Sequence, residues 1–427
     1  MTAVRFLGAI LLAEAAGVAL LSRLCRQPRS GPGALGLAFL LGTFVFGLWT
    51  HLLLWVRIPV TLLTVLVGPG VIAALGRWSV VRTWIWKRPP GAAWLQPAAA
   101  AFLLFGALSW PLLGFDGDTM YLPKAKSIVR HGTFWNEDFT DPSRIMPARR
   151  RPLLLPSLYA DIALLSGSWE GYLLRVWFVL LQVGGTAAFY DVLRSKTGRS
   201  EAAWGAGVYA WLPALAHDSG GALSGYADAP LAFLFLFALA SETRLAVFLL
   251  TAAVLLKDEG FAFLVPFALV RGIKPVLLPG LVGAAWIATA SFLPLDTDFL
   301  PRRFLQPQLA SLPTVLRHLG SELVALKHWS ILWLIVLGVL ACRLKTLARE
   351  DARWLLPVGV QLAIYAGVWL TFPPSDLSRL IKVEDMRLLL HVTPMAWTWA
   401  VRRACEVPSA DSPGPPGNPL TPGPADP

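Results

Sequence analysis

The sequence predicts an all-α, polytopic membrane protein with about 13 transmembrane helices and one or two juxtamembrane surface helices. Hydrophobic residues make up 56% of the 427-residue chain and charged residues only 15%. Soluble domains are about 45–50% apolar and about 25% charged. Many apolar runs reach the roughly 20 residues that cross a bilayer as a helix. Many of the 19 tryptophans lie near predicted helix ends, as an interfacial aromatic belt requires.

The charge balance indicates membrane topology rather than a nucleic-acid partner. The net charge is +11, and Lys and Arg collect in the cytoplasmic loops of membrane proteins. We therefore expect no nucleic acid to bind. Cys25, Cys342 and Cys405 are widely spaced and fall where we place the cytoplasmic side, so we expect no disulfide.

The first four apolar runs set the predicted orientation. We place them at residues 4–22, 32–54, 58–75 and 95–115. The first run contains Glu14 and lacks a small-residue cleavage site, so we interpret it as a membrane helix rather than a signal peptide. Basic residues follow the first and third runs, which places both loops in the cytoplasm. The loop from Asp116 to Arg151 then lies on the external face.

Within this loop, the sequence predicts a short helix on the membrane surface. Pro123 suits the first turn of a helix and Gly132 suits its end. Ala125, Ile128 and Val129 share one face of it, as in an amphipathic surface helix.

The next run, 152–166, is short for a membrane crossing. We therefore expect it to be a second surface or re-entrant helix. The crossings then continue with nine further runs, at 172–193, 202–216, 228–240, 245–256, 260–270, 276–293, 329–341, 354–371 and 388–401.

The pattern divides the chain into three parts. Residues 1–94 form an N-terminal three-span extension, and residues 95–403 form a membrane domain whose external loop, 115–170, carries the candidate site. Residues 404–427 form a cytoplasmic tail that is dense in Pro and Gly from 408 onward. Such a composition cannot bury a core, so we expect disorder there.

Charged and polar residues from distant stretches converge on the predicted external face. They are Asp116, Asp118, Lys124, Lys126, Arg149, Arg150, Arg151, Tyr226, Asp228, Lys257, Glu259, Arg387 and His391. A carboxylate beside cations can act as a general base toward a hydroxyl. Basic side chains can hold a phosphate leaving group and stabilise its developing charge. The combination predicts transfer chemistry on a phosphate-linked substrate.

Five groups of residues occur in order between Phe115 and Trp399. They are Asp116 with Pro123-Lys124-Ala125-Lys126, then Arg151-Pro152-Leu153-Leu154-Leu155-Pro156, Gly225-Tyr226-Ala227-Asp228-Ala229-Pro230, Lys257-Asp258-Glu259-Gly260, and Phe372-Pro373-Pro374 with Arg387-Leu388-Leu389-Leu390-His391 and Pro394. In this order they resemble the glycosyltransferase C superfamily, particularly bacterial relatives of the protein O-mannosyltransferases and the lipid A aminoarabinose transferases.

The resemblance implies a multi-pass glycosyltransferase of the bacterial inner (plasma) membrane, with its active face external (periplasmic). Asp116 would be the base that activates an acceptor hydroxyl, and the donor would be a sugar on a polyprenyl phosphate that enters from the membrane lipid, with inversion at the anomeric carbon. The implied ligands of the donor phosphate are Lys124, Lys126, Arg149, Arg150, Arg151, Lys257 and Arg387. Further site candidates are Asp118, Tyr226, Asp228, Glu259 and His391. No cofactor is implied.

Two features depart from the family pattern. Arg151 stands where the relatives usually have a Tyr before the Pro. In addition, three spans precede the external loop where the better-known relatives have one.

Other interpretations of the same residues stay open. Asp116 and Asp118 are also suited to capping the surface helix. A divalent metal there is less favoured because two carboxylates do not complete a hard-cation shell. The Arg149–Arg151 run is also suited to anionic headgroups. Asp228, Glu259 and His391 are also compatible with satisfied internal partners. For the whole chain, the alternatives are a transporter or flippase for an anionic lipid or polysaccharide precursor, and a non-catalytic membrane subunit.

Overall fold

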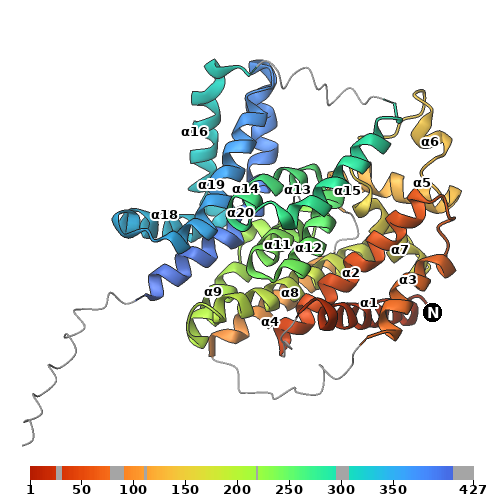
Figure 1. Ribbon diagram of the computed structural model, residues 1–427, viewed down its shortest axis with the longest axis horizontal. Helices are drawn as coiled ribbons and strands as arrows, with labels where there is room; N and C mark the ends of the chain where they lie inside the picture. The colour runs from red at the N-terminus through yellow and green to blue at the C-terminus, as the bar shows by residue number, and fades with distance from the viewer. Residues whose placement is uncertain (26–30, 77–90, 110–112, 218–219, 295–306, 407–427) are drawn as a thin grey trace, which may run out of the picture.

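A computed structural model describes residues 1–25, 31–76, 91–109, 113–217, 220–294 and 307–406, and every regular element in these ranges is a helix (Figure 1). The predicted all-α class is therefore confirmed. The predicted disordered tail at 408–427 lies outside the described residues.

The helices fall into two sequence halves. The first contains α1 (Thr2–Leu24), α2 (Pro32–Trp55), α3 (Leu62–Ala74), η2 (Gly91–Trp94), α4 (Leu95–Ser109), η3 (Gly117–Tyr121), α5 (Leu122–His131), α6 (Glu137–Thr140), α7 (Leu154–Ser166), α8 (Gly171–Arg194), α9 (Arg199–Ala210) and α10 (Pro213–Ala216). The second contains α11 (Asp228–Ala240), α12 (Thr243–Leu256), α13 (Asp258–Ala262), α14 (Leu264–Arg271), α15 (Lys274–Ala290), η5 (Leu309–Ser311), α16 (Leu312–Leu323), α17 (Leu326–Trp329), α18 (Leu332–Arg343), η6 (Leu344–Thr346), α19 (Arg349–Trp369) and α20 (Pro374–Cys405).

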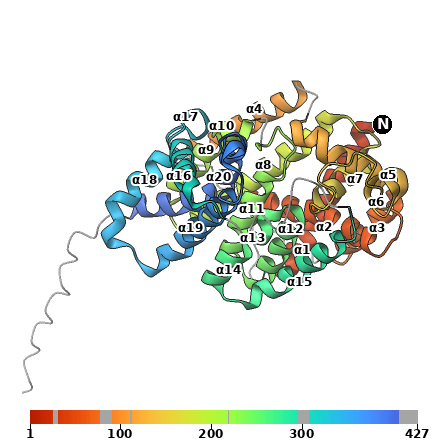
Figure 2. The same ribbon diagram turned by 90° about the horizontal axis from the view of Figure 1, so that it is seen from above.

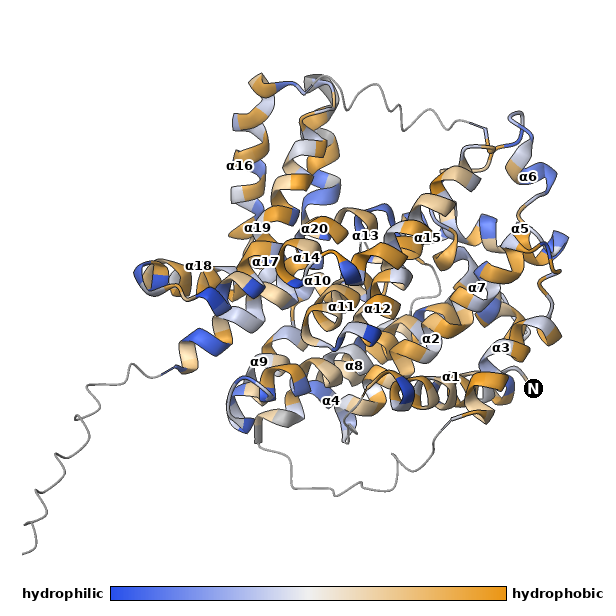
Figure 3. Ribbon diagram, in the orientation of Figure 1, coloured by the Kyte–Doolittle hydropathy of each residue, from blue (hydrophilic) through white to orange (hydrophobic). Residues whose placement is uncertain are grey.

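Three of the described helices, α1, α2 and α8, are long and apolar enough to cross a membrane. Six shorter apolar helices accompany them: α3, α4, α7, α11, α12 and α15. Figure 3 shows apolar residues along most of this helical body. On α1, Val4, Leu7 and Leu11 are exposed along one face, as suits contact with lipid. These spans indicate a membrane protein, while the count of about 13 crossings stays a prediction.

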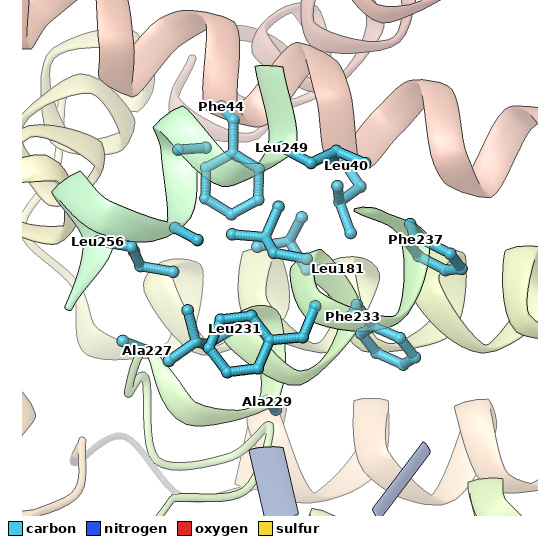
Figure 4. Close-up of a cluster of buried hydrophobic side chains, with 14 of the residues drawn as sticks. Leu40, Phe44, Leu181, Ala227, Ala229, Leu231, Phe233, Phe237, Leu249 and Leu256 are labelled. Atoms are coloured by element: carbon cyan, nitrogen blue, oxygen red, sulfur yellow. The ribbon is translucent and has the colours of Figure 1, made fainter. Parts of the chain in front are cut away.

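The main hydrophobic core lies between α2, α8, α11 and α12. Figure 4 shows Phe44 of α2, Leu181 of α8, Leu231 of α11 and Leu249 of α12 meeting there, and all four are buried. Because lipid tails are as apolar as these side chains, close packing rather than escape from water stabilises such contacts in a membrane. The two N-terminal spans thus share one core with the helices that carry the candidate site.

Small residues allow the N-terminal helices to approach closely. A Cβ placed on Gly17 of α1 would lie 1.7 Å from the Ala38 carbonyl oxygen of α2, and one on Gly42 of α2 would lie 1.7 Å from the Ala13 carbonyl oxygen of α1. Backbone contact through small residues is a common way for membrane helices to associate.

The loop that the sequence analysis places on the external face contains the predicted helix, α5. Pro123 lies in its first turn, and Gly132 ends it in the left-handed region with φ 69°. The segment predicted as a second surface or re-entrant helix, 152–166, forms α7, which is buried at every position except Leu164. This burial argues against the surface alternative and leaves the re-entrant one a prediction. The helix packs against α1, α2 and α5. Its sequence lacks the broad polar face that a surface helix needs, and its Asp161 is buried as well.

Helix α20 connects three regions of the molecule. Near its N-terminal end, Leu377 and Ile381 form a small second core with Val315 of α16 and with Tyr365 and Trp369 of α19. Figure 1 shows these parts of α16, α19 and α20 standing beyond the main body, and Figure 2 shows that α3, α5 and α6 lie at the opposite end of the molecule. The middle of α20 packs against α11.

The C-terminal end of α20 is locked to the start of α19. Asp351 accepts hydrogen bonds from Arg403 Nε at 2.8 Å and from Trp399 Nε1 at 2.9 Å. The Asp351 carboxylate also caps α19 by accepting the Ala348 N–H at 2.5 Å. This lock fixes the axial position of α20, and with it the residues that α20 contributes to the candidate site.

The close approach of α1 and α2 makes a testable prediction. We expect Gly17→Ala to lower the thermal unfolding midpoint of the detergent-purified protein, because its Cβ would overlap the Ala38 carbonyl and overpacking costs about 1–3 kcal/mol. Gly8→Ala is the matched control on the same helix, since no described atom lies within 4 Å of its new Cβ. Equal midpoints for the two variants would contradict the close contact.

Candidate functional site

The site is built around Asp228, the first residue of α11, whose side chain is completely buried. Its Oδ1 lies 2.6 Å from Lys257 Nζ and 2.9 Å from His391 Nε2, and its Oδ2 lies 3.2 Å from Arg387 Nε. The N-terminus of α11 is a favourable place for a carboxylate because the helix dipole is positive there. The junction of α12 and α13 and the middle of α20 therefore meet the start of α11 at one carboxylate.

Arg387 joins Asp228 to the loop that begins at Asp116. Its Nη1 lies 2.9 Å from Asp116 Oδ2. Its guanidinium carbon lies 4.7 Å from the centre of the Tyr226 ring. The Tyr226 hydroxyl oxygen in turn accepts the backbone N–H of Asp116 at 2.6 Å. The loop, the start of α11 and the middle of α20 thus form one connected unit.

Lys257 and His391 complete this unit. Lys257 lies between α12 and α13, and its Nζ also contacts Glu259 Oε1 at 2.9 Å. An ionised carboxylate only accepts hydrogen bonds, so His391 donates from Nε2 to Asp228. Its Nδ1, 2.8 Å from the Tyr365 hydroxyl, then accepts from that hydroxyl in the neutral ring.

We call Asp116, Asp228, Lys257, Glu259, Arg387 and His391 the Asp228 cluster. Carboxylates outnumber the permanent cations within it, and both cations are already in ion pairs. The cluster is therefore not an open cationic pocket. An anionic substrate must exchange with a carboxylate to reach Arg387 or Lys257.

Two members of the arginine run stabilise the loop. Arg149 is buried and donates from Nη2 to the Arg144 carbonyl. Arg150 donates from Nε and Nη2 to the Leu293 carbonyl at 3.0 and 2.6 Å, just beyond the end of α15. Trp286 of α15 donates back to the Arg150 carbonyl at 3.2 Å. We therefore leave Arg149 and Arg150 out of the proposed site.

The third arginine of the run lies closer to the cluster. Arg151 is half-buried, and its Nη1 lies 3.9 Å from Met120 Sδ. Burial by itself would lower the pKa of the Arg151 guanidinium, but Tyr121 first and then the carboxylates of Asp258, Glu259 and Glu384 raise it overall. Arg151 thus lies within electrostatic range of Glu259, a member of the cluster.

The two lysines of α5 behave differently from each other. Lys124, an implied ligand of the donor phosphate, is completely buried and donates from Nζ to the Ala148 carbonyl at 2.5 Å. Ala148 has a φ of 48°, so the lysine holds an unusual turn of the loop. Lys126 is exposed, with its Nζ 6.0 Å from the centre of the Trp169 ring.

Asp118 lies apart from the ion pairs of the cluster. Burial raises the pKa of its carboxyl group, and the nearby Arg175 guanidinium offsets part of that effect. The helix-cap interpretation is wrong, since neither η3 nor α5 receives a side-chain cap within the described loop. Across the described ranges, no group of three or more His, Cys, Asp or Glu residues is placed to hold a metal ion.

Three residues that the sequence analysis did not single out also reach the site. The Tyr159 hydroxyl donates to the Gly225 carbonyl at 2.6 Å, Tyr365 donates to His391, and burial raises the pKa of Glu384 next to Lys257 and Arg387. Glu384 stands three residues before Arg387 on α20, a spacing that places both on one helix face. That spacing is a usable signal, whereas nothing in the sequence marks either tyrosine.

No protein-family model, curated protein or solved structure matches the chain.

A second titratable group lies just before the cluster on α20. Asp385 is buried, and burial first and the Glu322 carboxylate second raise its pKa from 3.8 to about 6. Glu322 itself accepts from Trp329 Nε1 at 2.9 Å and contacts His328 Nδ1 at 2.5 Å.

We expect Asp385→Asn to stabilise the protein at neutral pH. The folded-state pKa is raised, so the ionised carboxylate opposes folding above pH 6, and this effect fades as the pH falls from about 6 toward 4. The shift corresponds to about 3 kcal/mol at most. The measurement is the thermal unfolding midpoint of wild type and of Asp385→Asn at pH 7.5 and pH 4.5. A difference between the two midpoints that is larger at pH 4.5 than at pH 7.5 would contradict the prediction.

We also expect Arg150→Gln to lower the unfolding midpoint, because the carbonyls beyond α15 lose their charged donor. Loss of a charged hydrogen bond typically costs about 1.5–3 kcal/mol. Arg130→Gln is the control, since Arg130 is an exposed residue of α5. A midpoint for Arg150→Gln equal to that of the control would show that Arg150 does not stabilise the loop.

Proposed function

We propose that the chain is an integral-membrane, inverting glycosyltransferase of the bacterial inner membrane, with about 13 crossings. It moves a sugar from a polyprenyl-phosphate donor to a hydroxyl of a lipid, glycan or protein acceptor on the external face. The observation that carries the proposal is the Asp116–Arg387–Asp228–Lys257 chain of ion pairs. It places one loop carboxylate against Arg387 of α20, and Asp228 links that arginine to a second cation, Lys257.

This arrangement supports a single displacement at the anomeric carbon. Asp116 takes the proton of the acceptor hydroxyl, and the acceptor oxygen attacks the anomeric carbon. The bond from that carbon to the phosphate oxygen breaks, and the polyprenyl phosphate leaves with the electron pair. Arg387 and Lys257 stabilise the negative charge that develops on the leaving phosphate, and attack opposite the leaving group inverts the configuration.

The ion pairs also suggest an order of binding. Before substrate arrives, Arg387 holds Asp116 at 2.9 Å. A donor phosphate offers two non-bridging oxygens that match the planar fork of the Arg387 guanidinium. Exchange of partners would leave the Asp116 carboxylate available to the acceptor. Asp228 would keep Arg387 and Lys257 in position during this exchange.

The proposal predicts that Asp116→Asn abolishes transfer, since an amide cannot take the acceptor proton. General-base catalysis typically contributes roughly 10²–10⁴-fold to the rate, so we expect a loss of that order. The measurement is transfer of labelled sugar from a polyprenyl-phosphate donor by purified protein. Glu137→Gln is the matched control, because Glu137 is an exposed carboxylate of the same loop that pairs with Arg144 at 3.0 Å.

Full activity of Asp116→Asn would contradict the mechanism. Movement of an anionic lipid across proteoliposomes by wild-type protein, without any glycosyl transfer, would favour a transporter instead.

A further inference from the structure

We propose that Tyr226 is a positioning residue that aligns Asp116 through its hydroxyl and Arg387 through its ring. The inference rests on the proposed function, in which Asp116 is the base and Arg387 contacts the donor phosphate. Tyr226 is buried and need not touch either substrate to act in this way.

The two contacts of Tyr226 are separate and of different chemistry. Its hydroxyl oxygen lies 2.6 Å from the backbone nitrogen of Asp116 and accepts that N–H. Its ring face lies 4.7 Å from the guanidinium carbon of Arg387, which is within the range of a cation–π contact. One side chain therefore holds both partners of the Asp116–Arg387 ion pair, at 2.9 Å from each other.

Tyr226 is itself held in place by its neighbours. Its backbone N–H donates to Ser224 Oγ at 3.0 Å. The preceding Gly225 has a φ of 72°, and a Cβ there would lie 2.5 Å from the Tyr159 hydroxyl oxygen. The Tyr159 hydroxyl donates to the Gly225 carbonyl at 2.6 Å. Only glycine fits this left-handed turn so close to Tyr159, and the turn directs the Tyr226 ring toward Arg387.

A second backbone contact sets the register between the two segments. Gly114 N–H donates to the Ser224 carbonyl at 2.9 Å, two residues before the Asp116–Tyr226 contact on each segment. Such a pair of contacts fixes both the distance and the direction of the Asp116 backbone. The orientation of the Asp116 side chain then depends on Arg387, which is its one ion-pair partner among the described residues.

Because the hydroxyl and the ring of Tyr226 contact different partners, we expect their removal to have different effects. Loss of the hydroxyl leaves the buried Asp116 N–H without its acceptor, which favours a shift of the backbone. A displacement of about 1 Å of a reacting group can reduce the rate by about 10²-fold. Loss of the ring removes a support of Arg387, so binding of the donor phosphate should weaken as well.

The experiment compares Tyr226→Phe, which keeps the ring, with Tyr226→Leu, which removes both contacts. Tyr209→Phe is the control, because Tyr209 is completely buried and its hydroxyl has no hydrogen-bond partner among the described residues. The readouts are kcat and KM for labelled donor, binding of polyprenyl phosphate alone by thermal shift, and the fraction of monodisperse protein.

We expect kcat of Tyr226→Phe to fall about 10-fold or more, with KM for the donor and polyprenyl-phosphate binding close to wild type. Tyr226→Leu should lower kcat and also raise KM and weaken binding. Tyr209→Phe should match wild type in kcat, in KM and in polyprenyl-phosphate binding.

Each outcome decides between the proposals. A wild-type protein that transfers no sugar overturns the proposed function, and with it the role of Tyr226. An active wild type with equal kcat in Tyr226→Phe and Tyr209→Phe overturns the positioning role alone. A kcat loss in Tyr226→Phe that disappears when activity is expressed per monodisperse protein overturns it too, because that loss reflects folding.

Discussion

The structure depends on keeping the Asp228 carboxylate paired inside the helical body. A charge removed from water without partners costs several kcal/mol even after relaxation. Asp228 avoids this cost by contacts with Lys257, Arg387 and His391 at 2.6 to 3.2 Å. Because these partners come from α20 and from the junction of α12 and α13, the carboxylate specifies how three parts of the chain meet. Loss of any one partner would leave a buried charge under-compensated.

The same ion pairs link the helical frame to Asp116, the proposed catalytic base. Arg387 extends the network from Asp228 to Asp116, and the Asp351–Arg403 lock at the far end of α20 holds the helix that carries Arg387. The loop is held independently through Arg150 and the end of α15. Rigid supports of this kind keep a reacting group within the small tolerance that catalysis requires. The frame and the site are therefore one connected structure.

The near balance of charge within the Asp228 cluster bears on how a substrate is recognised. A site of unpaired cations would attract any anion, whereas one whose cations are already paired admits only an anion that outcompetes a carboxylate. A phosphodiester, which shares one negative charge over two non-bridging oxygens, can do so through a paired contact with Arg387. In the proposed reaction, exchange of this kind would favour a phosphate-linked donor over simple anions and would couple donor binding to release of Asp116.

The sequence by itself determined the all-helical class, the apolar spans α1, α2 and α8, and the bounds of α5, because hydropathy, Pro123 and Gly132 act locally. Ordered motifs also marked the residues that meet in the Asp228 cluster. Only the tertiary structure decided which cations join the Asp228 cluster. Backbone carbonyls accept hydrogen bonds from Arg149, Arg150 and Lys124, whereas Asp228 forms ion pairs with Lys257 and Arg387. The tertiary structure also buried α7, which the sequence analysis had expected to be a second surface or re-entrant helix. Local patterns cannot distinguish these cases, since the partner of a long charged side chain is set by segments remote in sequence that pack beside it.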